Sequence, residues 1–387
     1  MREYGSEHPA IVLPDGYFES LSDLEREIMY LRSGREALLM AALAVRGERL
    51  EVREAYASEN VSNPVSLTPN PIILFPAYCC WSMSAPFEKT GYRVVYYRLN
   101  EDLTADLDYL KELMSRVKAD AILTMNYYGS AKTDDAVRLA KENGLVVIED
   151  FSHCTFSIKQ IFNPEVDIYV SSIRKSVGVC DGSIILSKEK MPEQYIQDEV
   201  KDFSDKRFVA QTDKRHYTWS KDQEKKQEFL GTIRECEGII DVFTAVRPIS
   251  ERSKKMLAQV NGEEIAYARR ENMRHLWNRL AVSGERLEKA GFKMVPGLER
   301  CFDGAPFSLP ILVENRDEVQ GKLARRGVYT QWLWPLCDDA MAVCPVSKEM
   351  NEKMLSVPID QRFSWDDIED IASIIIEVLG LGLAVSG

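Results

Sequence analysis

Strand-like and helix-like segments alternate over roughly the first half of the chain, from Leu21 to Ser187. The strand-like runs are short, apolar and rich in β-branched or aromatic residues, and they lie at 72–76, 92–97, 121–125, 145–150, 167–171 and 183–187. Between them, residues 107–117 and 134–143 carry apolar side chains at helical spacing, and Gly144 is a natural C-cap. Strands separated by helices of about ten residues predict crossover connections and a mostly parallel sheet covered by helices on both faces.

Two other segments have different patterns. Residues 24–45 carry apolar side chains at helical spacing, interrupted by the triplet Ser-Gly-Arg at 33–35. We therefore expect two successive helices there, the second starting at this break. Residues 188–235 are dense in Lys, Asp, Glu and Gln and hold few apolar residues. That composition is typical of a solvated helix pair or of a long surface excursion.

The C-terminal part mixes helices and strands. Helical patterns cover 239–287, 316–326 and 365–379, and strand-like runs cover 307–313 and 328–334. Ser364 is a natural N-cap for the last helix, and acidic residues occupy the first turn behind it. We predict an α/β fold with a large domain over 15–240, whose sheet is mostly parallel, and a smaller α+β domain over 241–387.

The composition excludes several classes of protein. The chain has 387 residues, 45% of them hydrophobic, so it can bury a large core. Its net charge of −12 argues against a general nucleic-acid or anionic-membrane binder, because those partners attract positive charge. No apolar run is long enough for a membrane helix, and residues 1–10 do not have the pattern of a secretory signal.

The cysteines and histidines bear on compartment and metal binding. None of the eight cysteines forms a CxxC pair, which is typical of reduced thiols in a cytoplasmic protein. The four histidines have no HExxH-type spacing, so we expect no metal site.

The sequence SSIRKSVGVCDGS at 171–183 places Lys175 in a turn directly after a predicted strand. In parallel sheets, chemistry gathers at the carboxyl ends of the strands. An amine held in a partly desolvated pocket loses its proton more easily and attacks a carbonyl, so Lys175 is a candidate for Schiff-base formation. The alternative is an ordinary surface lysine in a loop.

The sequence LVVIEDFSHC at 145–154 ends a buried strand in Asp150. An unpaired carboxylate is costly in such a place, so Asp150 needs a cationic partner or a polar site. A protonated pyridine nitrogen would be such a partner, and His153 can reach the same pocket. The alternative is an aspartate that caps the next turn beside a core histidine.

Two further signals precede these motifs. Ser33 and Gly34 come before a strong helical run, whose backbone N–H groups could bind an anion, although such residues often only cap a helix. Tyr78 and Trp81 follow the predicted strand at 72–76 and could stack on a flat ring, although such aromatic residues often belong to the core.

The order and spacing of these signals resemble those of the DegT/DnrJ/StrS family of pyridoxal-phosphate-dependent aminotransferases, which have the fold type I architecture. RSGREALLMAAL resembles the family's SGT-x-AL helix start, and ILFPAY its V-P-x-Y strand end. NYYGSAKTDDAVRLAKENGLVVIEDFSHC resembles its H-x-Y-G…V-I-E-D-x-A-H stretch, and SIRKSVGVCDGS its S-x-x-K…G-G segment. GVYTQWLWPL and MLSVPIDQRFSWDDIEDI resemble motifs of its C-terminal domain. The resemblance covers about residues 23–379.

The resemblance implies a role for each candidate residue. Lys175 would bind the cofactor pyridoxal 5′-phosphate as a Schiff base. Asp150 would pair with the ring nitrogen and keep it protonated, and His153 would hydrogen-bond near the phenolic oxygen. The phosphate would be held by backbone amides at a helix start and by a serine hydroxyl, from Ser33, Gly34, Arg35 and Ser172.

Two departures from the family pattern concern the surroundings of the cofactor. Cys80 stands where the family commonly has an aromatic residue that stacks on the ring, so Tyr78 or Trp81 would have to take that place. The Asn-x-Arg motif by which a neighbouring subunit reaches the phosphate is not evident in 188–235.

The resemblance implies an aminotransferase that moves an amino group from a donor such as glutamate to a keto substrate such as a nucleotide-linked keto-sugar. It also implies a homodimer, which the cysteine pattern places in the cytoplasm. A dehydratase or lyase with the same cofactor is one alternative, although Lys175 favours transamination because the family's sugar dehydratases carry histidine there. A cofactor-binding regulatory protein without catalysis is the other.

Overall fold

The computed structural model describes residues 17–59, 70–130, 132–199, 201–242 and 245–381. The prediction about residues 1–10 concerns a segment outside these ranges. Among the described helices, none combines the length and the apolar character that crossing a bilayer needs.

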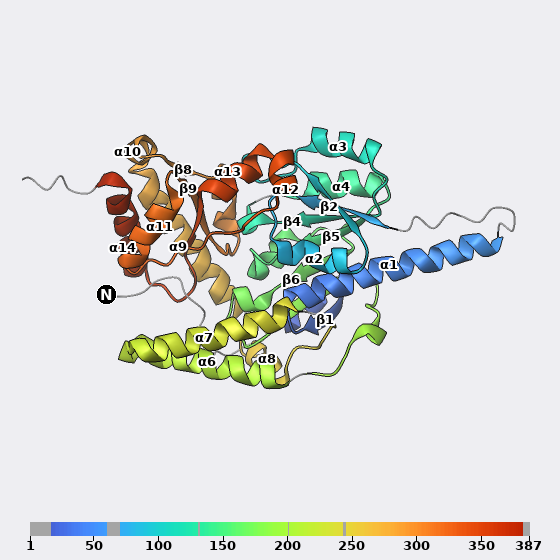
Figure 1. The fold of residues 1–387 in the computed structure, drawn as a ribbon, viewed down its shortest axis with the longest axis horizontal. Helices are drawn as coiled ribbons and strands as arrows, with labels where there is room; N and C mark the ends of the chain where they lie inside the picture. The colour runs from blue at the N-terminus through green and yellow to red at the C-terminus, as the bar shows by residue number, and fades with distance from the viewer. Residues whose placement is uncertain (1–16, 60–69, 131, 200, 243–244, 382–387) are drawn as a thin grey trace, which may run out of the picture.

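A seven-stranded sheet forms the core of the larger part of the molecule (Figure 1). Its strands, in chain order, are β1 (Glu27–Leu31), β2 (Ile72–Pro76), β3 (Arg93–Tyr97), β4 (Ala121–Met125), β5 (Val146–Asp150), β6 (Ile168–Ser171) and β7 (Ser183–Ser187). Their spatial order is β1-β7-β6-β5-β4-β2-β3. Strands β2 to β6 are parallel, whereas β7 is antiparallel to β6 and β1 is antiparallel to β7. The prediction of a mostly parallel sheet is confirmed.

Helices cover both faces of this sheet, as the crossover pattern predicts. On one face α1 (Gly34–Glu59) packs against α2 (Trp81–Lys89), and on the other α3 (Leu107–Arg116) packs against α4 (Asp134–Glu142). The side chain of Asp106 caps α3 by accepting a hydrogen bond from the Tyr109 amide. After α4 the chain turns at Gly144, whose φ of +71° favours glycine.

The prediction of a first helix within 24–45, before the Ser-Gly-Arg break, is wrong. Residues Glu27–Leu31 form strand β1, which pairs residue by residue with β7, from Glu27↔Ser187 to Leu31↔Ser183. The reason is tertiary: without β1, β7 would be a bare sheet edge with unpaired backbone groups. The second predicted helix does start at the Ser-Gly-Arg break, since α1 begins at Gly34.

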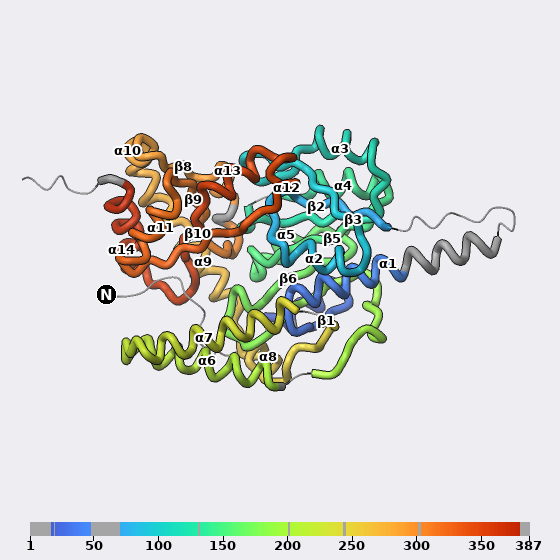
Figure 2. Tube along the Cα trace, viewed as in Figure 1, coloured from blue at the N-terminus to red at the C-terminus, as the bar shows by residue number. Residues whose placement is uncertain are grey.

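The charged segment after β7 folds as a helix pair, which confirms the first of the two alternatives. Helix α6 (Lys201–Ser220) and helix α7 (Gln223–Asp241) pack along each other, and the Asp222 side chain caps α7 by accepting hydrogen bonds from two backbone amides. Figure 2 shows that the pair lies on one side of the molecule, outside both sheets.

The C-terminal part contains a second, antiparallel sheet in the order β10-β9-β8. Its strands are β8 (Phe292–Met294), β9 (Ser308–Val313) and β10 (Met354–Pro358). Its longer helices are α9 (Gly262–Ala281), α11 (Arg316–Arg325), α13 (Pro345–Lys353) and α14 (Trp365–Ile376), and its shorter ones are α8 (Glu251–Leu257), α10 (Gly284–Lys289) and α12 (Asp338–Val343). Ser364 and Asp367 form a capping box at the start of α14, as the sequence predicts.

The strand predicted over 328–334 is absent from this sheet. A single bridge between Gln331 and Ser356 is what remains of it in the described structure. This segment contacts the larger part of the molecule instead. The Leu333 carbonyl accepts a hydrogen bond from the Tyr78 hydroxyl, and the Trp334 ring packs against the Tyr78 ring. Because of these contacts, the backbone of this segment is irregular and does not pair with β10 as a strand.

Candidate active site

The carboxyl ends of β4, β5 and β6 meet at one edge of the large sheet. Met125 pairs with Asp150, and Asp150 pairs with Val170, so the three strands end almost in line. Parallel strands present their next residues at the same edge, where ligands bind in open α/β sheets. The loops after β5 and β6 carry the two strongest motifs of the sequence.

Asp150 is the last residue of β5 and is 4% exposed. Its Oδ1 accepts a 2.7 Å hydrogen bond from the Ser152 amide. Burial raises the pKa of the Asp150 carboxyl, while the positive charge of Lys175 and the bond from Ser152 act in the opposite direction. The structure therefore brings Asp150 and Lys175 close enough for their charges to attract.

Lys175 ends a single 3₁₀ turn, Ile173–Lys175, that follows β6. Its amide donates a 3.2 Å hydrogen bond to the Ser172 carbonyl, which fixes the turn. The side chain is half-buried and its Nζ lies 6.0 Å from the centroid of the Trp334 ring. Lys175 and His153 both line a cavity of about 200 Å³ between the two sheets.

His153 is 1% exposed and lies among aromatic rings. Its ring stacks on Phe307, with centroids 5.1 Å apart, and on Trp334, at 5.4 Å. Burial lowers the pKa of His153 well below its usual value, and the charge of Lys175 acts in the same direction. Neither ring nitrogen has a hydrogen-bond partner in the described structure. A neutral, unpartnered imidazole on a cavity wall is suited to bind a polar ligand atom.

The predicted anion site lies where α1 starts against the turn after β6. A Cβ built on Gly34 would be 3.1 Å from the Ser172 Cβ, so only glycine allows this close approach without a shift. The Ser33 hydroxyl is used in capping, since it accepts from the Glu36 amide and donates to the Glu36 carboxylate. The Arg35 side chain leaves the site and pairs with Asp241 at 2.6 Å.

These contacts decide which groups of the helix start can reach a ligand. Helix geometry leaves the first amides, at Gly34 and Arg35, without an intrahelical acceptor. Together with the Ser172 hydroxyl they form the polar part of this corner. Ser33 contributes indirectly, because its side chain caps the start of α1 and so fixes the shape of this corner.

The two aromatic residues predicted as stacking partners lie in different surroundings. Tyr78 is buried behind the cavity wall, with its ring 5.1 Å from Trp334 and 5.7 Å from Tyr127. Trp81, the first residue of α2, is 55% exposed. Neither residue lines the cavity around Lys175, whose aromatic walls are His153, Phe307, Tyr329 and Trp334.

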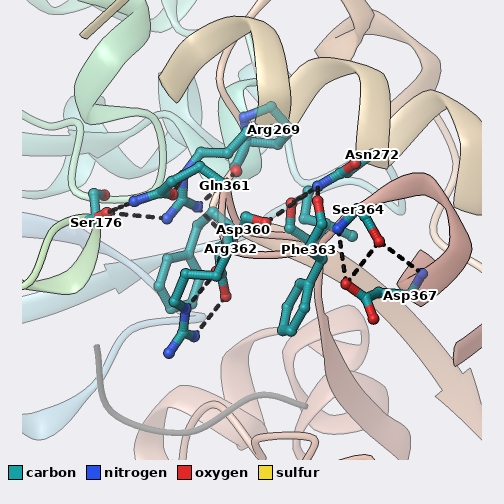
Figure 3. Close-up of polar contacts among 12 residues, drawn as sticks. Ser176, Arg269, Asn272, Asp360, Gln361, Arg362, Phe363, Ser364 and Asp367 are labelled. Atoms are coloured by element: carbon teal, nitrogen blue, oxygen red, sulfur yellow. Dashed lines mark hydrogen bonds and ion pairs between the residues drawn. The ribbon is translucent and has the colours of Figure 1, made fainter. Parts of the chain in front are cut away.

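The sequence did not single out the polar residues that the C-terminal part brings to this cavity (Figure 3). Arg269 of α9 is fully buried and donates hydrogen bonds to the carbonyls of Ser176, Pro306 and Phe307. Its Nε donates to Gln361 Oε1, and Gln361 Nε2 donates in turn to the Ser176 carbonyl at 2.9 Å.

Next to them, Arg362 forms a bidentate ion pair with Asp360. The one sequence signal for Asp360, Gln361 and Arg362 is that they lie in MLSVPIDQRFSWDDIEDI, which resembles a motif of the family's C-terminal domain. Nothing local distinguishes Arg269 from the other arginines of α9.

Positive charge predominates on the cavity wall. Lys175, Arg174, Arg269 and Arg362 line it, against the single carboxylate of Asp360. Burial lowers the pKa of Arg269 to about 10, which leaves its guanidinium protonated at neutral pH. Such a wall favours an anionic ligand.

No family model matches the chain, and a search of curated proteins found no match. Solved aminotransferase structures are similar to it along nearly its whole length. "Helicobacter pylori PseC, aminotransferase involved in the biosynthesis of pseudoaminic acid" is 14% identical, with a TM-score of 0.64 over 98% of this chain and 99% of that one. The putative sugar aminotransferase Spr1654 from Streptococcus pneumoniae, in its PMP form, is 13% identical, with a TM-score of 0.63 over 98% and 99%.

A DegT DnrJ EryC1 StrS aminotransferase from Brucella abortus is 15% identical, with a TM-score of 0.61 over 94% of this chain and 88% of that one. The chain has the fold type I aminotransferase fold. The Brucella abortus structure is named for the family that the sequence motifs resemble. In this aminotransferase fold, Asp150 at the end of β5 and His153 and Lys175 in the loops after β5 and β6 lie at one edge of the sheet.

Proposed function

We propose that this protein is a pyridoxal-5′-phosphate-dependent aminotransferase of the DegT/DnrJ/StrS family. It moves an amino group from a donor such as glutamate to a keto substrate, which we propose is a nucleotide-linked keto-sugar. One observation carries the proposal: the Lys175 amine lies within electrostatic reach of the buried Asp150 carboxylate and shares a cavity with His153, whose ring nitrogens are unpartnered in the described structure.

The residues of the site fit this cofactor. Lys175 would hold its aldehyde carbon, the Asp150 carboxylate would pair with its ring nitrogen, and His153 would hydrogen-bond to its phenolic oxygen. The phosphate would lie against the amides at the start of α1 and the Ser172 hydroxyl. The close approach of Gly34 to Ser172 supports this assignment, because a larger residue would fill the corner.

When bound, the cofactor supplies a ring that takes up electrons from the carbon next to the donor nitrogen. The Asp150 carboxylate would keep a proton on the ring nitrogen, which makes the ring a better electron acceptor. Lys175 Nζ would take the proton from the donor α-carbon and deliver it to the cofactor's aldehyde carbon, on the other side of the donor nitrogen. Phe307 and Trp334 would exclude water, and the cationic wall would attract the carboxylate or phosphate of the substrates.

We further propose that the protein works in the cytoplasm as a homodimer. The seven cysteines whose side chains the structure describes are all free thiols, which supports a reducing compartment. The family resemblance and the fold support the dimer.

The test is to load the purified protein with pyridoxal 5′-phosphate, add glutamate and follow the visible absorbance, then supply a panel of keto-sugars and keto acids. Lys175→Ala should lose both the absorbance of lysine-bound cofactor and the turnover. Lys190→Ala is the matched control, because Lys190 is exposed and pairs with Glu193 away from the cavity. Normal transamination by Lys175→Ala would refute the assignment. Cofactor binding without any response to glutamate would favour the regulatory alternative, and loss of a sugar hydroxyl would favour the dehydratase.

A further inference from the structure

We propose that the helix pair α6–α7 supports the Lys175 turn, and that Glu237 of α7 is a positioning residue acting through Arg174. The inference rests on the role proposed above for Lys175. It gives a function to the charged segment that the family motifs do not explain.

The central contact is a bidentate ion pair next to the reactive lysine. Arg174, the neighbour of Lys175, donates from Nη1 to Glu237 Oε1 at 2.6 Å and from Nη2 to Glu237 Oε2 at 3.1 Å. Two parallel hydrogen bonds between a guanidinium and a carboxylate fix both distance and orientation. The Arg174 side chain is 13% exposed, so water competes little for the pair on that side.

A second arginine fixes the carboxylate itself. Arg207 of α6 is 1% exposed and donates to Glu237 Oε1 at 2.7 Å. Burial alone would raise the pKa of Glu237, but the charges and hydrogen bonds of Arg174 and Arg207 outweigh it and lower the pKa to about 2. Glu237 of α7 therefore stays ionised at neutral pH, held by Arg207 of α6 on one side and by Arg174 of the lysine turn on the other.

Further contacts join the helix pair to both ends of the predicted cofactor site. Gln211 of α6 donates from Nε2 to the Val179 carbonyl at 3.1 Å, beyond the lysine turn. Asp241, the last residue of α7, pairs with Arg35 at the start of α1. Lys226 of α7 donates to the hydroxyl of Tyr329, which lines the cavity. The helix pair thus touches the turn, the anion corner and the cavity wall.

The opposite side of the turn is held from the C-terminal part. The Ser176 carbonyl accepts hydrogen bonds from Arg269 Nη2 at 3.2 Å and from Gln361 Nε2 at 2.9 Å (Figure 3). Lys175 therefore lies between two anchored neighbours, Arg174 on one side and Ser176 on the other. Two fixed points restrict the backbone of the residue between them, and with it the position from which the amine reaches the cavity.

The experiment compares Glu237→Gln with Glu235→Gln in the cofactor-loaded enzyme. Glu235 is the matched control, because it lies on the same helix and pairs with Lys206 in an exposed contact away from the turn. Glu237→Gln should lower kcat by about 10- to 100-fold with the KM for the amino donor within about twofold, because a misplaced catalytic group slows chemistry more than binding. Glu235→Gln should leave both constants within about twofold of the wild type.

Two readouts do not depend on turnover. The induced circular dichroism of the bound cofactor should weaken in Glu237→Gln, because the lysine that orients the ring moves. Hydrogen exchange of residues 172–179 in the unloaded chain should become faster. Both signals should stay at wild-type level in Glu235→Gln.

A second variant covers the case in which Glu237→Gln does not fold, since that change leaves the buried Arg207 without its carboxylate. Arg174→Gln keeps the pair between Glu237 and Arg207 and should give the same loss of kcat, and Arg174→Lys should restore part of it. Wild-type kcat and circular dichroism in Arg174→Gln would overturn the inference while leaving the proposed function intact. Absence of cofactor binding and turnover in the wild type would instead overturn the proposed function.

Discussion

His153 and Phe307 stack face to face, with ring centroids 5.1 Å apart and ring planes 12° apart. A hydrogen bond from the Phe307 amide to the His153 carbonyl, 2.9 Å long, holds the two segments together. His153 follows β5 of the large sheet and Phe307 precedes β9 of the small one, so this contact joins the two sheets at the cavity. The site therefore depends on how the two parts of the chain pack.

Phe307→Ala should weaken that junction. The change removes a half-buried ring and leaves a gap beside His153, so the free energy of unfolding should fall by about 2 kcal/mol. Chemical denaturation measures it, and the affinity for pyridoxal 5′-phosphate should fall with it. Phe307→Leu, which fills most of the gap, should lose less than half as much. Equal losses in the two variants would contradict the role of the ring in filling this space.

Asp150→Asn should separate cofactor binding from catalysis. The amide keeps the shape of the carboxylate but not its charge, so the ring nitrogen would lose the partner that keeps it protonated. Turnover should fall by about 100-fold or more while cofactor is still bound. Steady-state kinetics with glutamate measures the loss, and Asp366→Asn, at an exposed position of α14, is the control. Turnover within a few-fold of the wild type would contradict the role proposed for Asp150.

Glu149 should make stability fall as pH rises. Burial raises the pKa of this carboxyl to about 7 from its ordinary 4.5, although hydrogen bonds from Thr133 and Thr124 act against the rise. A folded-state pKa above the unfolded one means that the neutral carboxyl contributes fully below pH 4.5. That contribution is lost between about pH 4.5 and pH 7, a change of about 3 kcal/mol in the free energy of unfolding.

The check for Glu149 is a pair of stability curves. The free energy of unfolding of the wild type and of Glu149→Gln is measured with denaturant from pH 4 to pH 8. In that window the wild type should lose stability relative to the variant as pH rises, so the two curves should not be parallel. Parallel curves would show that Glu149 titrates normally in the folded protein.

Gly34→Ala should impair the anion corner without unfolding the protein. The new Cβ would lie 3.1 Å from the Ser172 Cβ, so one of the two backbone segments must shift. The affinity for pyridoxal 5′-phosphate, measured by equilibrium dialysis, should fall by about tenfold, which is 1.4 kcal/mol of binding free energy.

Gly47→Ala is the matched control, because Gly47 lies on the same helix and a Cβ there would meet no atom within 4 Å. It should leave cofactor affinity unchanged and stabilise the helix by up to about 1 kcal/mol. The same loss of affinity in both variants would mean that the corner is not the phosphate site.

The elements of the first half were largely predictable because their evidence is local. Runs such as 121–125 are almost entirely apolar and are buried along their whole length. The end of α4 is marked by Gly144, because its positive φ favours glycine. In that half the sequence pattern missed β1, which pairs with a strand far along the chain. In the C-terminal part, the segment 328–334, predicted as a strand, is instead held irregular by contacts with Tyr78. The boundary near residue 240 between two domains stays a prediction.

For the site, the local pattern was enough to place Asp150 at the end of one parallel strand and Lys175 just after the next, because a strand–helix–strand pattern puts successive carboxyl ends at one edge. Their roles toward a cofactor stay predictions. Three sets of contacts depend on the three-dimensional packing instead: the ion pair of Glu237 with Arg174, the hydrogen bonds of Arg269 and Gln361 to the Ser176 carbonyl, and the stacking of Phe307 on His153. Local periodicity records which face of an element is apolar, but contacts between side chains far apart in the chain depend on how whole elements pack, and no short stretch of sequence encodes that.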